Sequence, residues 1–364
     1  MSATLEGVPV TTASRSSRVA RLLTRLLVPL AAVGLGLLVG AIAIVLSGGS
    51  PIEAYGALLR GAVGTPSNLN ATLARAVPIV VVGVGLAIAF RAGALNLGGE
   101  GQMVVAAVVT AVVAGWSGDL PMPVGILLAV GAGCLAGAAW ALVPTLLQLR
   151  FEVPLLITTL LLNYVGVLFA AWLVSYPLRE VGGGVAQTPT IPDPTQLPYL
   201  APGGRLHAGV LLLVVLPVVA WWLLGRTVAG YEMRMTGLNT AFAEYGGVNG
   251  RRTLLRAMLL SGAVCGLAGA LIVLGVHHRY IDGSVTAPGY AWTGFTAALL
   301  AGGEPIATLV AGLFLAGLET GAAGMERNTD IPFQIVAVVQ ACIILMIAIR
   351  LTLGRWIGRH LGGG

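Results

Sequence analysis

Lysine is missing from this sequence, because all 20 of its basic residues are arginine. A phosphate-binding loop of the G-x-x-x-x-G-K-[ST] kind needs its lysine, so we do not expect this chain to bind and hydrolyse ATP itself. A Schiff-base mechanism is excluded for the same reason.

Charged residues are also scarce, at 9% of the chain, whereas 57% of the residues are hydrophobic and the mean hydropathy is +0.92. Soluble domains carry about 25% charged residues. A chain this apolar cannot cover a water-facing surface, so lipid is its natural solvent. The net charge of +6 does not indicate a nucleic-acid partner, because the arginines stand beside apolar segments rather than on a soluble face.

Motifs for catalysis or metal binding are lacking as well. The three cysteines, Cys134, Cys265 and Cys342, lie inside apolar runs without a C-x-x-C pair, which is typical of small buried residues. His277 and His278 are adjacent and would point to different faces of a helix. No G-x-S-x-G or H-E-x-x-H occurs. We therefore expect neither an enzyme active site nor a metal or cofactor in this chain.

The apolar runs predict an all-α, polytopic membrane helix bundle of about ten membrane segments, forming one domain over residues 26–350. The run at 290–302 is too short to cross a bilayer and predicts a re-entrant half-helix, which must be buried in protein or line a cavity. Residues 47–72 are expected to form an outer connection. The runs are 26–46, 73–90, 103–115, 123–147, 154–175, 209–225, 257–276, 290–302, 305–323 and 332–350.

Arginine placement predicts the orientation, since positive charge collects on cytoplasmic segments. Four arginines precede the first run, and five lie in residues 226–256. The tails at 1–25 and 351–364 are therefore expected in the cytoplasm, together with the loop at 226–256. The proline-rich stretch at 176–208 is expected to be an external loop.

A glycine-rich polar stretch interrupts two short apolar runs at residues 91–102, and it contains Asn96, Glu100 and Gln102. A carboxylate at membrane depth costs at least about 2.5 kcal/mol, so it faces a partner or a water-filled cavity. One interpretation is a broken helix that lines a solute path. The other is a cytoplasmic turn between two ordinary spans, which Arg91 favours.

Four further residues could contact a solute. Asn163 and Tyr164 lie in the middle of a span, where an asparagine either bonds a neighbouring helix or contacts a solute. Trp292 and Phe295 begin the half-helix, where aromatic rings either stack on a planar solute or anchor the chain at the interface.

Three late carboxylates need an account of their own. The simplest interpretation of Glu319, Glu326 and Asp330 is structural pairing with Arg327.

The stretch GYEMRMTGLNTAFAEYGGVNGRRTLLRAMLLSGAVCGLAG resembles the permeases of nucleoside-type ABC importers, part of the larger set that also moves ribose and branched-chain amino acids. In that family the loop holds a coupling helix that docks on an ATPase subunit. The resemblance assigns this role to Gly237, Leu238, Asn239, Ala243, Tyr245, Gly246 and Gly247. Glu244 stands where the family often has a basic residue.

Other stretches agree with this resemblance in the same order along residues 75–350. They are GALNLGGEGQ, the segment from Glu152 to Tyr164, the loop containing QTPTIPDPTQLP, and the end beginning PGYAWTGF. The resemblance implies a type II ABC importer-like permease in a bacterial plasma (inner) membrane. It further implies an ATPase subunit that binds ATP and Mg, a second permease chain, either different or identical, and a substrate-binding lipoprotein.

A nucleoside is uncharged, planar at one end and hydroxylated at the other. Amide side chains, glycines and a few aromatics with little net charge suit such a solute. They suit a ribose-like sugar too, and a branched-chain amino acid permease shares the fold. An ion-coupled secondary transporter would use Glu100 as its ion site, but such a carrier has no need of an arginine-rich ATPase dock.

Overall fold

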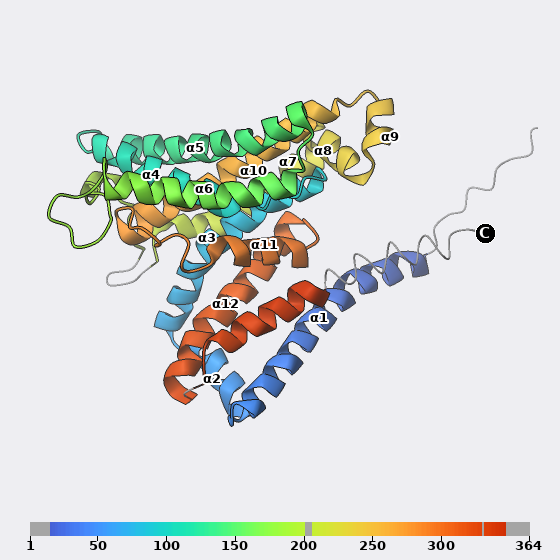
Figure 1. Cartoon of the computed structure of the whole chain (residues 1–364). Coiled ribbons are helices and arrows are strands. Elements are labelled where there is room, and N and C mark those ends of the chain that lie inside the picture. The colour runs from blue at the N-terminus through green and yellow to red at the C-terminus, as the bar shows by residue number, and fades with distance from the viewer. Residues whose placement is uncertain (1–14, 201–205, 330, 347–364) are drawn as a thin grey trace, which may run out of the picture.

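A computed structural model describes residues 15–200, 206–329 and 331–346, which form a helical bundle (Figure 1). The expected tail at 351–364 and the first residues of the tail at 1–25 lie outside this range. The helix α1 begins within the cluster of arginines that precedes the first apolar run. The helices are α1 Arg15–Leu46, α2 Pro51–Val63, α3 Pro66–Arg91, α4 Gly99–Trp116, α5 Met122–Phe151, α6 Leu155–Ser175, α7 Leu212–Arg226, α8 Val228–Leu238, α9 Thr240–Tyr245, α10 Gly250–Ile272, α11 Tyr290–Leu300 and α12 Pro305–Thr329, with short turns η1 Asp193–Thr195, η2 Ala208–Leu211 and the π-helical η3 Val273–His277.

Seven helices of the described chain are long and apolar enough to cross a membrane. The helices α1 and α2 form a further pair, bent by 118°, and α11 and Gln334–Met346 are shorter apolar helices. These elements correspond to the expected segments, and the half-helix predicted at 290–302 is α11, which has 11 residues.

Residues 47–72 are not the simple connection expected from the sequence, because they hold α2 and the start of α3. Pro51 and Pro66 each occupy the first turn of a helix, where their fixed φ favours helix formation. The hydroxyl of Thr65 caps α3 by accepting a hydrogen bond from the Asn68 N–H. The helix α2 then buries Ala54 and Ala57 in a cluster with α12, so a segment of modest hydropathy gains its helix from packing.

The helix α3 lies at the centre, between α10 on one side and α11 and α12 on the other (Figure 1). Its residues from Ala76 to Ala89 are all buried. Small residues allow the neighbouring helices to approach closely. A Cβ atom on Gly137 of α5 would lie 2.8 Å from the Cα of Gly266 on α10. This packing of backbone on backbone is typical of helices in lipid.

The two ends of the bundle differ in structure. The helices α8 and α9 lie at one end, which we call the α8–α9 end (Figure 1). At the other end, the long-loop end, residues 176–200 pack on the segment after η3. The Thr188 N–H donates to the Tyr280 carbonyl at 2.9 Å, and Arg279 pairs with Glu180 at 3.0 Å.

Candidate functional site

The central helix α3 ends in a hydrogen-bonded glycine turn at the α8–α9 end. The Gly93 N–H donates to the Phe90 carbonyl and the Ala94 N–H donates to the Ala89 carbonyl, both at 3.0 Å. This is a Schellman motif, whose left-handed position is taken by Gly93 with φ +76°. The turn reverses the chain toward the bundle interior.

Residues 92–98 then run back into the bundle without forming a helix, so α4 begins well inside it. A Cβ atom on Gly99, the first residue of α4, would lie 3.4 Å from Val82 and 3.5 Å from Leu86 of α3. Val82 precedes Arg91 by nine residues, which is about 13 Å along a helix. The segment 92–98, called the break below, is therefore a buried interruption and not a turn between two full spans.

Amide side chains hold the break in place. Asn96 and Gln102 are fully buried and bond to each other through two amide contacts of 3.2 Å. The Asn96 amide also donates to the Ser261 hydroxyl of α10 at 2.9 Å, and its carbonyl accepts from the Gly98 N–H. Every polar atom of the Asn96 side chain is thus used within the fold.

Asn163 of α6 supports the break from the other side. Its carbonyl accepts from the Gly101 N–H at 2.9 Å, and its amide donates to the Leu97 carbonyl at 2.8 Å. The Thr159 hydroxyl accepts from the Leu97 N–H. Non-helical backbone at membrane depth needs such partners, because lipid offers none.

Three of the candidate solute contacts are therefore supports behind the break: Asn96, Gln102 and Asn163. Tyr164, the neighbour of Asn163, is 67% exposed on the outer surface of α6, and the structure does not bring it to the break. Thr159 and Ser261 are supports that the sequence analysis missed. A hydroxyl inside an apolar run was the available signal, but the sequence alone does not tell which run it faces.

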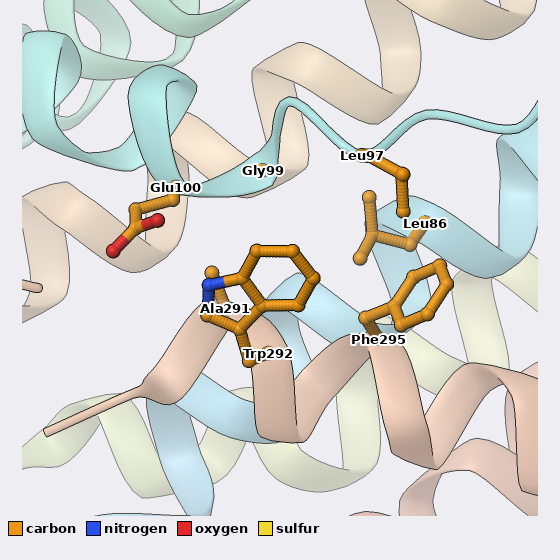
Figure 2. Close-up of a pocket in the computed structure, with 7 residues that line it drawn as sticks. All are labelled: Leu86, Leu97, Gly99, Glu100, Ala291, Trp292 and Phe295. Atoms are coloured by element: carbon orange, nitrogen blue, oxygen red, sulfur yellow. The ribbon is translucent and has the colours of Figure 1, made fainter. Parts of the chain in front are cut away.

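The other three candidates, Glu100, Trp292 and Phe295, do come together around a small pocket of about 10 Å³ (Figure 2). Leu86, Leu97, Gly99 and Ala291 complete its lining. The Trp292 indole and the Glu100 side chain line the same pocket. Phe295 lies edge-on to Trp292, with ring centroids 6.3 Å apart.

Two helix N-termini meet at this pocket. The helix α4 begins at Gly99, and α11 begins at Tyr290, whose neighbours Ala291 and Trp292 line the same space. A Cβ atom on Gly294 would lie 2.8 Å from the Ile79 carbonyl, which places the start of α11 at a similar depth along α3. The positive ends of both helix dipoles thus face a site inside the membrane domain.

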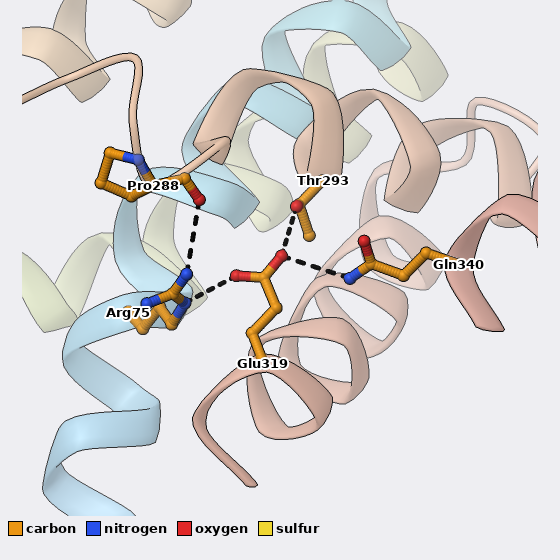
Figure 3. Close-up of polar contacts among 5 residues, drawn as sticks. All are labelled: Arg75, Pro288, Thr293, Glu319 and Gln340. Carbon is orange, nitrogen blue, oxygen red and sulfur yellow. Dashed lines mark hydrogen bonds and ion pairs between the residues drawn. The ribbon is translucent and has the colours of Figure 1, made fainter. Parts of the chain in front are cut away.

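A partly buried ion pair fixes the start of α11 (Figure 3). The Arg75 Nε of α3 lies 2.6 Å from Glu319 of α12, and the Glu319 carboxylate also accepts from Thr293 and from Gln340. Arg75 donates to the Pro288 carbonyl as well, just before α11.

The expected pairing of Glu319 with Arg327 is wrong. The Arg327 Nε bonds the carbonyl of Ala323 in its own helix. Sequence proximity favoured Arg327, but α3 brings Arg75 to Glu319 from 244 residues away.

The candidate coupling residues lie in and around α9. Asn239 caps this helix by accepting from the Phe242 N–H at 3.0 Å. Ala243 is buried, whereas Leu238 is 82% exposed and Tyr245 is 94% exposed. Gly246 and Gly247 form the turn that follows, and Gly247 has φ +86°. This short helix therefore presents apolar side chains to its surroundings at the tip of the bundle.

Gly237, at the end of α8, contacts the Schellman turn directly. A Cβ atom there would lie 2.2 Å from the Arg91 carbonyl and 2.9 Å from the Gly93 nitrogen. Arg91 in turn donates to the Gly303 carbonyl and pairs with Glu304 at 2.6 Å, between α11 and α12. The Schellman turn after α3 thus contacts the end of α8, and Arg91 beside it bonds the segment between α11 and α12.

Among the described residues, no group of three or more His, Cys, Asp or Glu side chains is placed to hold a metal ion.

Comparison with known proteins gives the site its context. Residues 68–353 match the family described as branched-chain amino acid transport system / permease component. The guanosine ABC transporter permease protein NupP of Bacillus subtilis is 32% identical over 341 residues, covering 92% of this chain and 97% of NupP.

Two further relatives have similar coverage. The nucleoside ABC transporter permease protein NupB of Lactococcus lactis is 30% identical, over 90% of this chain and 91% of its own. The glucose ABC transporter permease protein TsgB13 of Haloferax volcanii is 31% identical, over 88% of this chain and 86% of its own.

Proposed function

Because the chain belongs to the family of branched-chain amino acid transport system permease components, we propose that it moves nucleosides into the cell as one of two permeases of an ATP-binding cassette importer. The chain is a membrane-embedded transport subunit and not an enzyme. ATP hydrolysis takes place on a separate subunit, and ATP and Mg are proposed to bind there.

The observation that carries the solute assignment is the pocket between the N-termini of α4 and α11. Trp292 and Phe295 offer aromatic faces to a planar base, and the Glu100 carboxylate can accept hydrogen bonds from hydroxyls or ring N–H groups. Two of the three relatives above are named for guanosine or nucleosides. A glucose permease stands among them as well, so a sugar is the second candidate.

The pocket also supports a second permease chain. Trp292 is 47% exposed, and Glu100 lies beside it at membrane depth. A carboxylate there cannot face lipid without a large cost. A partner permease, identical or different, that covers this face would enclose a shared path between the two chains.

The exposed side chains of α9 support the ATPase dock. Leu238 at the end of α8, and Phe242 and Tyr245 of α9, are all more than 60% exposed. The basic residues of α10 stand next to them, so we place this end in the cytoplasm, with the long-loop end facing the binding lipoprotein. Glu100 could instead serve an ion-coupled carrier, but such a carrier gives no role to this apolar helix.

The test is reconstitution of the full complex in proteoliposomes, with uptake of guanosine, adenosine, ribose, glucose and leucine measured with and without ATP. We expect ATP-dependent uptake of the nucleosides. Trp292→Ala should lower nucleoside uptake about tenfold, since base stacking contributes about 1–3 kcal/mol, while the ATPase still co-purifies. Tyr245→Glu should remove ATP-driven uptake in a folded chain.

Preferred uptake of ribose or glucose would contradict the nucleoside assignment alone. Uptake that persists in a complex without the ATPase would contradict the importer mechanism itself.

A further inference from the structure

The pocket between the starts of α4 and α11 is nearly closed in this structure. Its volume of about 10 Å³ is about the space that one water molecule needs, whereas small-molecule sites enclose about 300–1,000 Å³. The side chains that line the pocket must therefore separate before a solute can occupy it or pass through it. The question is which of these side chains close the pocket toward the α8–α9 end.

The helix α11 runs parallel to α3, toward the α8–α9 end. A Cβ atom on Gly294, near the start of α11, would lie 2.8 Å from the Ile79 carbonyl, and one on Gly303, just past its end, would lie 3.4 Å from the Cβ of Phe90. Residues later in both helices thus lie nearer the α8–α9 end. Phe295 is therefore the lining side chain of α11 that lies nearest to that end.

An aromatic contact continues from the pocket in the same direction. Phe90 follows Leu86 of the pocket lining by one turn of α3, so both lie on the same face. The ring of Phe90 meets the ring of Phe295 edge-on, with centroids 5.7 Å apart. Both rings are only partly buried. The Phe90–Phe295 contact thus lies between the pocket and the α8–α9 end, where α3 and α11 meet.

Arg91 holds the end of α11 beside the end of α3. The Arg91 Nε donates to the Gly303 carbonyl at 2.9 Å, and the guanidinium also pairs with Glu304 at 2.6 Å. The planar guanidinium can make both bonds at once. The two side chains of the pair are 35% and 38% exposed, so the pair can open at modest cost. While it is closed, Arg91 keeps Phe295 against Phe90.

The same residue is in contact with the coupling region. A Cβ atom on Gly237 would lie 2.2 Å from the Arg91 carbonyl. A displacement of α8 therefore acts directly on the residue whose side chain bonds the end of α11.

We propose that the Phe90–Phe295 contact is the inner gate of the solute pocket and that Arg91 is the positioning residue that keeps it closed. The assignment rests on the proposed function for the orientation of the chain and for the movement of α8 by the ATPase. When α8 moves, Arg91 releases Gly303 and Glu304. The end of α11 then leaves α3, the two rings separate, and the solute passes into the cytoplasm.

The experiment measures access to the pocket wall from the cytoplasmic side. Leu97→Cys places a thiol at the pocket, and a membrane-impermeant maleimide is added without ATP to inverted vesicles that contain the full complex. The complex without this substitution gives the background of the three native cysteines. We expect slow labelling of position 97. Arg91→Met should accelerate it about tenfold, the effect of losing one charge-assisted hydrogen bond. Phe90→Ala should accelerate it without changing the ion pair.

Three further variants serve as controls. Arg256→Met breaks the pair of Arg256 with Glu232, 3.1 Å long, which joins α10 to α8 at the same end of the bundle. It should leave the labelling unchanged. Glu304→Gln keeps the shape and removes only the charge, so it replaces Arg91→Met if that variant does not assemble. Arg91→Lys keeps the charge without the fork of donors and should give an intermediate rate.

A second measurement separates a gate from a merely structural contact. Proteoliposomes are loaded with guanosine, and its downhill efflux is followed without ATP. Arg91→Met and Phe90→Ala should leak faster than the wild-type complex, and Arg256→Met should not. A loss of thermal stability without a leak would show that Arg91 has only a structural role.

The outcomes separate this inference from the proposed function. Faster labelling from the cytoplasmic side in Arg91→Met and Phe90→Ala, but not in Arg256→Met, supports the inner gate. Equal rates in all variants overturn it, as does acceleration seen only in right-side-out vesicles. Absence of ATP-driven nucleoside uptake by the wild-type complex would instead count against the proposed function, because the labelling of position 97 does not depend on the solute.

Discussion

Gly237 and Gly93 touch backbone to backbone, joining the end of α8 to the turn that ends α3. A Cβ atom built on Gly93 would lie 3.2 Å from the Cα of Gly237. The contact has no side chain that could bend out of the way, so a shift of α8 must move the start of the break. In the proposed transporter, this contact is a direct connection between the ATPase dock and the break beside the solute pocket.

Substitution of Gly237 by alanine should test that connection. The added methyl would lie 2.2 Å from the Arg91 carbonyl, so either α8 or the Schellman turn must move. Forcing extra atoms into a packed site costs about 1–3 kcal/mol. We expect a lower thermal stability and less solute transported per ATP hydrolysed.

Gly225→Ala is the matched control, because nothing lies within 4 Å of a Cβ atom at that position. Equal ratios of uptake to ATP hydrolysis in both variants would show that the contact at Gly237 carries no coupling.

Hydropathy predicted the bundle and its half-helix well, because a span must be apolar over about 20 residues and α11 is visibly too short. It failed at α2, whose alanines and glycines have little hydropathy and become helical by packing on α12. The polar interruption at 91–102 was also visible. The depth of this interruption within the membrane domain could not be predicted, because it depends on where Gly99 contacts α3.

Asn163→Leu should destabilise the break. The substitution keeps the number of heavy atoms and the branch point but leaves the Gly101 N–H and the Leu97 carbonyl without their partner. Each unpaired buried group costs about 1–3 kcal/mol. We expect a clear loss of thermal stability in detergent, accompanied by loss of uptake.

Tyr164→Leu changes the next residue, which is 67% exposed, and should leave stability nearly unchanged. A similar stability loss in the two variants would contradict the supporting role assigned to Asn163.

The sequence singled out Asn96, Gln102 and Asn163 correctly as unusual, because amides inside apolar runs must find partners. The sequence did not distinguish side chains that hold the break in place from side chains that line a solute path. That difference depends on the Asn96–Gln102 amide pair and on the position of Ser261, set by helix packing across 165 residues. Glu100 was equally visible, and only the fold places it in the same pocket as Trp292.

The Arg75–Glu319 pair should behave as a coupled unit. Arg75→Met leaves the partly buried Glu319 carboxylate without its cation, and the cost should lie below the roughly 3–5 kcal/mol of a fully buried pair, because Arg75 is 32% exposed. The double variant Arg75→Met with Glu319→Met removes both charges, so it should be more stable than either single variant. Thermal unfolding of all four proteins gives the coupling energy.

Because Thr293 bonds Glu319 beside Trp292, the double variant should also raise the solute concentration needed for half-maximal uptake. Additive stability losses in the double variant would show that the two residues act independently.

Acid should loosen the long-loop end through His207. This side chain is 1% exposed, and its Nδ1 accepts a hydrogen bond from the Gly209 N–H, which requires the neutral ring. Burial, together with the charge of His278, lowers the pKa of His207 from 6.5 to about 4. The unfolded chain therefore binds the proton first as the pH falls, and stability is lost between pH 6.5 and 4.

The full effect is about 3 kcal/mol, from the pKa difference alone. We expect the thermal midpoint of the purified complex to fall as the pH is lowered from 6.5 to 5, with faster hydrogen exchange in residues 188–197 and 206–211. His207→Asn keeps a capping acceptor that does not titrate in this range. The variant should start from a lower stability at pH 7.5 but change less with pH, and an equal slope in both proteins would assign the acid response to other groups.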